Sequence, residues 1–131
     1  MNNATKKLIA ELYADGDRDI LHFEYVYGGV KFDEADKPRS QDVEKLIAAT
    51  LSIFSILVES GDFNLFEAKF ENEKISHHPK SLDDEQIEKN LLRNYAQSKS
   101  EMDFGYQYFL KKNEIGKIPS ASCPDILGQL R

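Results

Sequence analysis

The longest uncharged apolar stretch of the chain runs from Leu46 to Val58 and constrains the fold more than any other feature. Its 13 residues are too few to cross a bilayer, which requires about 20. Apolar side chains recur in it at spacings of three and four, and Leu51 and Ile56 widen the apolar arc beyond a single stripe. Because a helix that is apolar on most sides is usually packed on most sides, we predict a buried central helix here.

The flanking residues indicate where this helix begins and ends. Ser40 is a good N-terminal cap, and Asp42 and Glu44 put negative charge in the first turn, where the helix dipole favours it. Gly61 supplies a C-terminal stop. We therefore expect the helix to run from Ser40 to Ser60.

The segments before this helix show two different patterns. Apolar residues at helical spacing predict a short helix over Ala4–Ala14. β-forming residues alternate over Ile20–Phe32, where Gly28-Gly29 is a two-residue turn signal. We therefore predict a β-hairpin at Ile20–Phe32.

The segments after the helix are shorter and partly ambiguous. We expect a strand over Asp62–Phe70, and either a second strand or an exposed loop over Ile75–Pro79. Ser81 is expected to cap a further helix, with three acidic residues in its first turn. Alternation over Met102–Leu110 favours a strand, whereas the lysines and glycine that follow suit a helix end, so both remain open.

Together these elements predict the fold class α+β. We expect a compact single domain, with three or four helices around a long central apolar helix and a small antiparallel sheet. The 131 residues have the length of one domain, and 40% of them are hydrophobic, which is enough for a core. The globular domain is expected to span residues 1–118, and residues 119–131, with two prolines, to form an irregular C-terminal tail.

The acidic and basic side chains are unevenly distributed. The chain has a net charge of −6, and residues 1–88 hold 19 acidic and 10 basic side chains, against 4 and 7 in residues 89–131. The densest acidic stretch is Glu11–Glu44. Such a surface disfavours nucleic acid, and it either simply keeps the protein solvated or steers a basic partner towards it.

No residue pattern indicates a catalytic or metal site. The adjacent His77 and His78 lack the spacing of zinc ligands, and Cys123 lies in the expected tail, away from any pocket that would activate a thiol. The sequence lacks the nucleophile-elbow and phosphate-loop motifs. We therefore predict no enzyme activity, no catalytic residues, no metal and no cofactor.

The single cysteine and the polar N-terminus bear on the compartment. Cys123 has no partner for an internal disulfide, and Met1–Lys7 contains no apolar signal core. We expect a cytoplasmic protein with no membrane partner.

Tyrosines are the residues that most suggest binding. Tyr25 and Tyr27 are two residues apart on a predicted strand and have acidic neighbours, Glu24 among them. One interpretation is sheet packing, and the other is an interface anchor, because tyrosine is enriched at binding hot spots. A nucleic-acid platform would instead need basic residues between the aromatic ones.

Two segments carry a resemblance to a known class of protein. They are LIAATLSIFSILVESGDFNLFEAKF (Leu46–Phe70), an apolar helix leading into a strand, and SLDDEQIEKNLLRNYAQ (Ser81–Gln97), a capped helix. In these segments and in its acidic character, the chain resembles the small immunity proteins of bacterial polymorphic-toxin and contact-dependent growth-inhibition systems. The resemblance implies a cytosolic toxin inhibitor that acts by protein–protein interaction and blocks one cognate toxin.

The predicted function follows from this resemblance and from the charge. We expect the chain to neutralise a cognate protein toxin domain, such as a nuclease domain, by occluding its basic surface, and to be a monomer or a weak homodimer. The expected partner-binding residues are acids and tyrosines of two regions: Asp15, Asp17, Asp19, Glu24, Tyr25, Tyr27, Asp33, Glu34, Asp36, Glu71, Glu73, Asp83, Asp84 and Glu85.

Two other functions remain open. A secretion chaperone or adaptor for an effector protein is similar in size and charge, and it would be a dimer with an apolar groove. A small enzyme would require a pocket that holds at least two titratable groups with shifted pKa values, and His22 with a neighbouring carboxylate is its one starting point.

Overall fold

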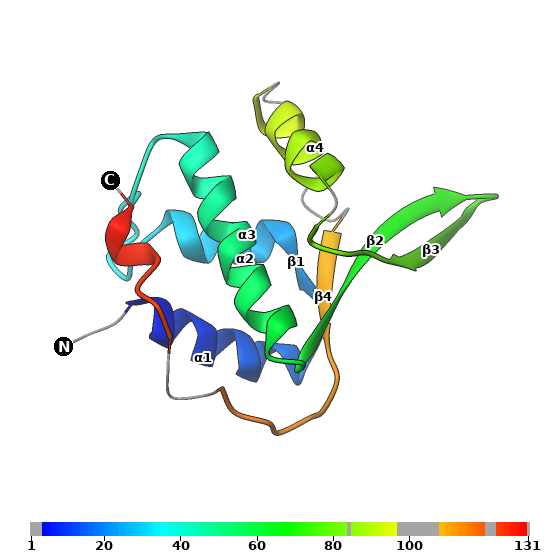
Figure 1. Ribbon diagram of the computed structural model, residues 1–131, viewed down its shortest axis with the longest axis horizontal. Coiled ribbons are helices and arrows are strands. Elements are labelled where there is room, and N and C mark those ends of the chain that lie inside the picture. Colours follow the sequence, from blue (N-terminus) through cyan, green and yellow to red (C-terminus); the bar gives the residue numbers. More distant parts are fainter. Residues whose placement is uncertain (1–3, 84, 97–107, 120–122, 131) are drawn as a thin grey trace.

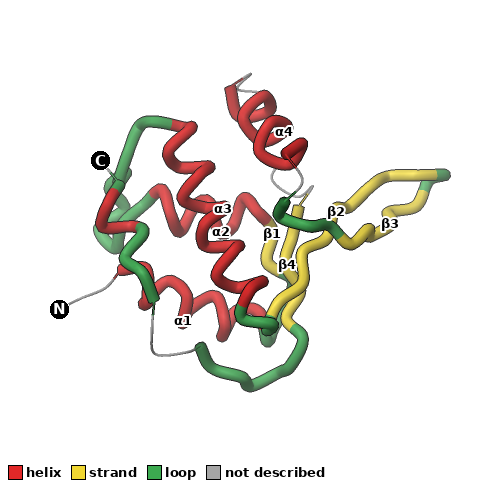
Figure 2. Tube along the Cα trace, in the orientation of Figure 1, coloured by secondary structure: helices red, strands yellow, loops and turns green. Residues whose placement is uncertain are grey.

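Helices and strands occupy separate parts of the molecule (Figures 1 and 2). The computed structural model describes residues 4–83, 85–96, 108–119 and 123–130. The elements follow the order α1 (Ala4–Gly16), β1 (Leu21–His22), α2 (Phe23–Lys31), α3 (Val43–Glu59), β2 (Phe63–Glu71), β3 (Lys74–Pro79), α4 (Glu85–Ala96), β4 (Tyr108–Lys112) and the 3-10 turn η1 (Leu127–Gln129). The fold is therefore α+β, as the sequence predicts.

The four strands form one antiparallel sheet in the order β1-β4-β2-β3. Leu65 of β2 lies opposite Leu110 of β4, which in turn lies opposite Leu21 of β1. All three are buried in the core formed with the helices. The β2–β3 hairpin extends beyond this core and projects away from the helices (Figure 1).

α3 is the longest of the described helices, and its buried residues recur at helical spacing. It begins later than the sequence predicts. The N-terminal cap is Asp42, whose carboxylate accepts the backbone N–H groups of Glu44 and Lys45, whereas the Ser40 hydroxyl accepts the N–H of Asp42 before the helix starts. The predicted stop is confirmed, because Gly61 follows the helix with a φ of +84° that suits glycine.

The prediction of a β-hairpin over Ile20–Phe32 is wrong. Only Leu21 and His22 of this range belong to a strand of the sheet, and the nine-residue helix α2 follows at once. The side chains that alternate in sequence also fit a helical period, because Phe23, Val26, Tyr27 and Val30 fall at i, i+3, i+4 and i+7 and are all buried. Gly28-Gly29 is thus part of a helix instead of a turn.

Arg39 explains how α2 ends. Its guanidinium donates hydrogen bonds to the carbonyl oxygens of Gly29, Val30 and Phe32, at 2.7, 3.0 and 2.9 Å. The carbonyl groups at the end of a helix lack partners within the helix, so a cation that bonds them stabilises that end. This contact lies ten residues from Gly29 in sequence, beyond the range of local turn signals.

The later segments resolve the ambiguities of the sequence. The Ile75–Pro79 segment lies in a strand, β3, paired with β2. α4 begins at Glu85, later than expected, and the Ser81 hydroxyl accepts the N–H of Asp83 in the preceding turn. Of the Met102–Leu110 segment, residues 108–110 belong to strand β4, and the residues before Tyr108 lie outside the described part of the chain.

The C-terminal segment includes a short packed element. η1 lies against α1, and Leu127, which is only 2% exposed, belongs to the core. The Thr5 hydroxyl accepts the backbone N–H of Leu127 at 2.8 Å, so the two ends of the chain are joined.

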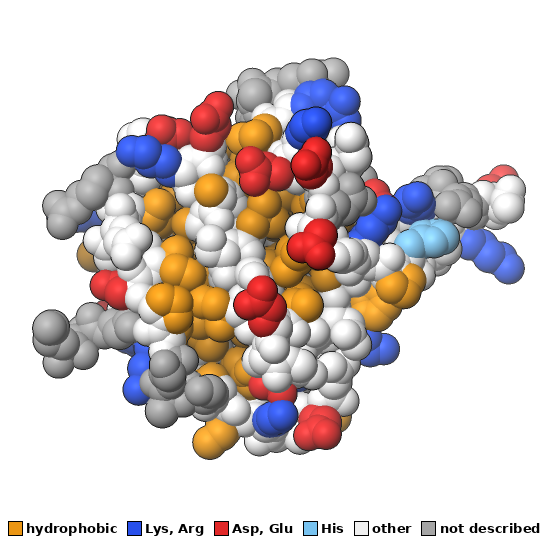
Figure 3. All heavy atoms as spheres, viewed as in Figure 1, with side chains coloured by type: hydrophobic (Ala, Val, Ile, Leu, Met, Phe, Trp, Pro, Cys, Tyr) orange, Lys and Arg blue, Asp and Glu red, His pale blue; other side chains and the backbone are white. Residues whose placement is uncertain are grey.

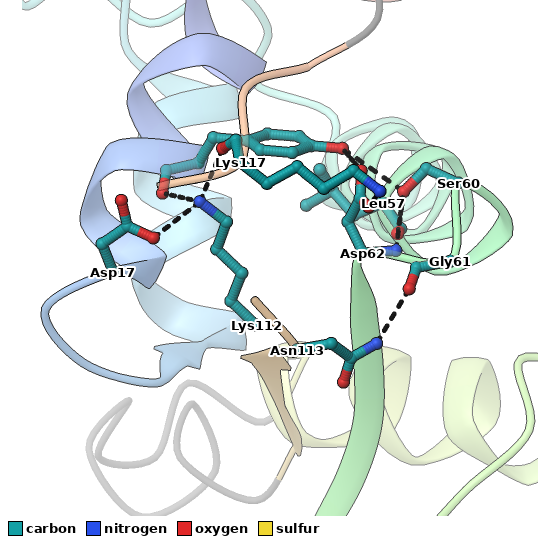
Figure 4. A network of polar contacts seen from close by, with 9 residues as sticks. Asp17, Leu57, Ser60, Gly61, Asp62, Lys112, Asn113 and Lys117 are labelled. Carbon is teal, nitrogen blue, oxygen red and sulfur yellow. Dashed lines mark hydrogen bonds and ion pairs between the residues drawn. The ribbon is translucent and has the colours of Figure 1, made fainter. Parts of the chain in front are cut away.

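A polar network joins the end of α1 to the turn before β2 and the segment after β4 (Figure 4). Lys112, whose side chain is 1% exposed, donates to the carbonyl oxygens of Tyr13 and Lys117 and to the Asp17 carboxylate, the last at 2.7 Å. The hydrogen bond from Lys112 lowers the pKa of Asp17. Burial acts to raise the pKa of Asp62, but hydrogen bonds from Lys117 and Tyr13 outweigh it, so the net shift is downward.

None of the described helices combines the length and the apolar character needed to cross a membrane.

Candidate functional site

A cleft of about 370 Å³ lies between α1 and α2. We call it the α1–α2 cleft and define it by its lining. Helix α1 contributes Leu8, Glu11, Leu12 and Asp15. Helix α2 contributes Glu24, Tyr25, Gly28 and Gly29.

The two glycines of α2 shape this cleft. A Cβ atom added at Gly29 would lie 2.8 Å from Cδ1 of Leu8, so the absence of a side chain lets the two helices approach closely. A Cβ atom at Gly28 would meet nothing within 4 Å, which leaves open space above the helix. Gly29 therefore permits the short distance between the helices, and Gly28, which has no side chain, leaves the space of the cleft unfilled.

Three carboxylates and one phenol give the cleft its polar character. The Tyr25 hydroxyl donates a hydrogen bond to Oδ2 of Asp15, which connects the two helices. This hydrogen bond, together with burial and the negative charges of Asp15 and Glu11, raises the pKa of Tyr25 to about 12. Tyr25 is nevertheless 55% exposed, so it remains available for contact from outside.

The cleft brings together three of the residues expected to bind a partner. They are Asp15, Glu24 and Tyr25. Glu11 was not among the expected residues, although it lies four residues before Asp15 and residues at that spacing share a helix face. The sequence pattern predicts a turn at Gly28-Gly29, so it does not indicate that these glycines shape a cleft between helices.

Tyr27, which the sequence predicts to bind a partner, is buried in the core. It is 4% exposed, and its ring stacks on Phe23 with centroids 6.0 Å apart. In a helix, residues i and i+2 point in different directions, so Tyr25 and Tyr27 cannot share a face as they would on a strand. Tyr27 therefore offers almost no surface to a partner in this structure.

Other predicted residues have structural partners of their own. Asp17 belongs to the Lys112 network, and Asp19 accepts the backbone N–H of Ile20. Asp33 accepts the N–H groups of Lys37 and Ala35, and these bonds lower its pKa, with the bond from Lys37 having the larger effect.

Glu34 and Asp36 lie in the same loop as Asp33. Glu34 forms an exposed ion pair with Lys7 of α1. Asp36 adopts a left-handed φ of 59°. Neither lines the α1–α2 cleft.

The second predicted acidic region lies on different elements. Glu71 ends β2 and Glu73 is in the turn of the β2–β3 hairpin, whose flanks also carry Lys69, Lys74 and His77. Figure 3 shows basic and histidine side chains on the projecting hairpin, and acidic side chains dispersed among apolar ones on the rest of that face. Asp83 and Glu85 are exposed near the start of α4, and Asp84 lies outside the described residues.

The residues considered for catalysis or metal binding lie elsewhere. Burial lowers the pKa of His22, whose ring lies 6.1 Å from that of Phe109. The ring of His77 meets that of Phe109 edge-on, with the ring centroids 4.7 Å apart. Nε2 of His78 lies 3.0 Å from the Ser76 hydroxyl. Within the described ranges, no group of three or more His, Cys, Asp or Glu side chains is arranged to hold a metal ion.

The cleft suits a ligand with a positive charge. The carboxylates offer hydrogen-bond acceptors and Tyr25 offers apolar surface, whereas Leu8 and Leu12 are only 9% and 1% exposed. His22 is not among its lining residues, so the cleft does not combine this histidine with the carboxylates. Comparison of the chain with protein-family models, with curated proteins and with solved structures found no match.

Proposed function

We propose that this chain is a small acidic binding protein that neutralises a cognate toxin domain by occluding its basic surface. The α1–α2 cleft is the observation that supports the proposal, because it places Glu11, Asp15 and Glu24 around an exposed tyrosine. The resemblance to immunity proteins supplies the kind of partner, a toxin such as a nuclease whose substrate site is positively charged.

Charge acts on the association rate constant of the complex, and Tyr25 acts on its dissociation rate constant. A net charge of −6 attracts a basic surface from a distance and raises the association rate. Tyr25 contributes once the surfaces meet, because a partly exposed aromatic ring buries a large area at a small entropic cost and slows dissociation. In this proposal the loop acids Asp33, Glu34 and Asp36 add to the field without lining the cleft.

The first experiment identifies the neighbouring genes and measures binding of this chain to any toxin domain that they encode. We expect a one-to-one complex by sedimentation, loss of toxin activity on mixing, and an association rate that falls steeply as salt rises. A dimer that binds only unfolded segments would instead support the secretion-chaperone alternative. Failure to bind or inhibit the folded domain would contradict the proposal.

Matched variants test whether the cleft provides the field. Glu11→Gln and Asp15→Asn together should slow association by about 10-fold at low salt and by less at high salt. Glu59→Gln is the control, since Glu59 is also an exposed helical glutamate but lies on α3, outside the cleft. The control removes one charge where the double variant removes two, so slowing by about 3-fold in the control would show that only net charge matters.

A further inference from the structure

The composition of the α1–α2 cleft points to a single kind of side chain. We propose that it receives one arginine side chain of the partner, an inference that rests on the proposed function and specifies the chemistry of its contact. The cleft volume of about 370 Å³ lies near the lower end of the range of about 300–1,000 Å³ for small-ligand sites. That is appropriate for one long side chain.

A cationic side chain near Glu11 is engaged elsewhere: Lys7 interacts electrostatically with Glu11, but its ammonium is paired with Glu34. No lysine or arginine of the described residues forms an ion pair with Glu11 or Asp15. Arg18 acts electrostatically on Tyr25, but it does not line the cleft. Two carboxylates on one face of α1 therefore remain available to a cation from outside.

Tyr25 supplies accessible apolar surface to the cleft, whereas Leu8 and Leu12 are only 9% and 1% exposed. The open space at Gly28 continues the cleft over α2. Lysine and arginine both bury an aliphatic stem along apolar surface while the charged head reaches polar groups. A metal ion or a small inorganic cation would leave this apolar surface unused.

Tyr25 distinguishes arginine from lysine. Its hydroxyl is engaged with Asp15, which orients the ring at the edge of the cleft and leaves 55% of the residue exposed. A planar guanidinium stacks on an aromatic face and bonds a carboxylate with two N–H groups, whereas an ammonium is a compact, strongly hydrated point charge. The pairing of an exposed ring with carboxylates therefore favours arginine.

A peptide titration of the full chain tests this assignment. We would add acetyl-Gly-Arg-Gly-amide to the ¹⁵N-labelled protein and follow the backbone amide signals of Tyr25, Gly28 and Gly29. Saturable shifts confined to the cleft are expected, with a Kd of about 1 mM for so small a ligand. Peptides with lysine, or with citrulline as the uncharged isostere of arginine, should bind at least about 5-fold more weakly.

Two variants separate charge from shape. Glu11→Gln with Asp15→Asn should reduce binding of the arginine peptide by about 10-fold. Gly28→Leu should abolish binding by filling the cleft while the protein stays folded, because a Cβ at Gly28 meets no atom within 4 Å. Glu59→Gln should bind as the unchanged protein does.

Several results would overturn the inference. These are shifts that do not saturate or lie outside the cleft, equal binding of the lysine or citrulline peptide, and unchanged binding by Gly28→Leu. Dimerisation that the cleft variants abolish, seen by sedimentation, would assign the cleft to a second copy of the chain and contradict the inference too. If the toxin domain is bound and inhibited while the arginine peptide is not, this inference fails and the proposed function stands.

Discussion

At the scale of single residues, burial and hydrogen bonding give two tyrosines of α2 different environments. Tyr25 and Tyr27 are chemically identical and two positions apart, yet Tyr27 is packed in the core and Tyr25 bonds Asp15 at the surface. The carboxylate accepts a hydrogen bond only from the neutral phenol, and its negative charge disfavours a phenolate nearby. The tyrosine therefore stays protonated over an unusually wide pH range.

Removal of this carboxylate should restore ordinary titration of Tyr25. Asp15→Asn is expected to lower the Tyr25 pKa from about 12 towards the usual value of 10.0, because the first cause of the shift is lost. Ring ¹³C chemical shifts recorded over a pH series would measure it. Asp19→Asn is the control, since Asp19 does not act on Tyr25. An unchanged Tyr25 pKa in Asp15→Asn would refute the contact.

At the scale of elements, packing of α2 against α3 stabilises the helix at Phe23–Lys31, and the close approach of Gly29 to Leu8 of α1 shapes the cleft. Burial of four side chains at helical spacing stabilises α2 despite two adjacent glycines, each of which costs about 1 kcal/mol relative to alanine in a helix. Arg39 adds the hydrogen bonds that the end of the helix lacks. Neither contribution is local to the Gly28-Gly29 pair.

Alanine at each glycine should have opposite effects on stability. Gly28→Ala is expected to raise the free energy of unfolding by about 0.5–1 kcal/mol, because its Cβ is unobstructed and alanine favours the helix. Gly29→Ala should lower it by about 1 kcal/mol, since its Cβ at 2.8 Å from Leu8 forces the core to shift. Urea unfolding measures both. Destabilisation by Gly28→Ala would favour a glycine turn over the helix.

At the scale of the whole molecule, the two ends of the chain are held by a shared contact. Leu127 enters the core beside α1, and its backbone N–H bonds the hydroxyl of Thr5, which is itself buried. The polar network around Lys112 likewise connects the segment after β4 to α1 and to the residue before β2 through hydrogen bonds (Figure 4). Residues far apart in sequence thereby complete one core.

Truncation of Leu127 measures how much the C-terminal segment contributes. Leu127→Ala should lower the free energy of unfolding by about 2–4 kcal/mol, the usual cost of removing a fully buried leucine side chain. Ile118→Ala, at a side chain that is 78% exposed in the same part of the chain, should change it by less than about 0.5 kcal/mol. Similar effects at the two positions would argue against a packed C-terminal segment.

Part of the candidate site was predictable from the sequence and part was not. Asp15, Glu24 and Tyr25 were identified from local charge and residue type, which need no knowledge of the fold. Glu11 could have been added from its spacing to Asp15 on a helix. The cleft itself was not predictable, because it depends on the close approach of Leu8 to Gly29, residues on two different helices.

The amino-acid sequence by itself determined the α+β class, the apolar helix ending before Gly61 and the acidic character, because periodicity, caps and charge are properties of neighbouring residues. Only the tertiary structure decided that Phe23–Lys31 is a helix, that Tyr27 is buried, and that three carboxylates surround one cleft. The short segment fits both a period of two and a period of 3.6, so its local preferences are nearly balanced. Burial against α3 and the bonds from Arg39 then select the helix.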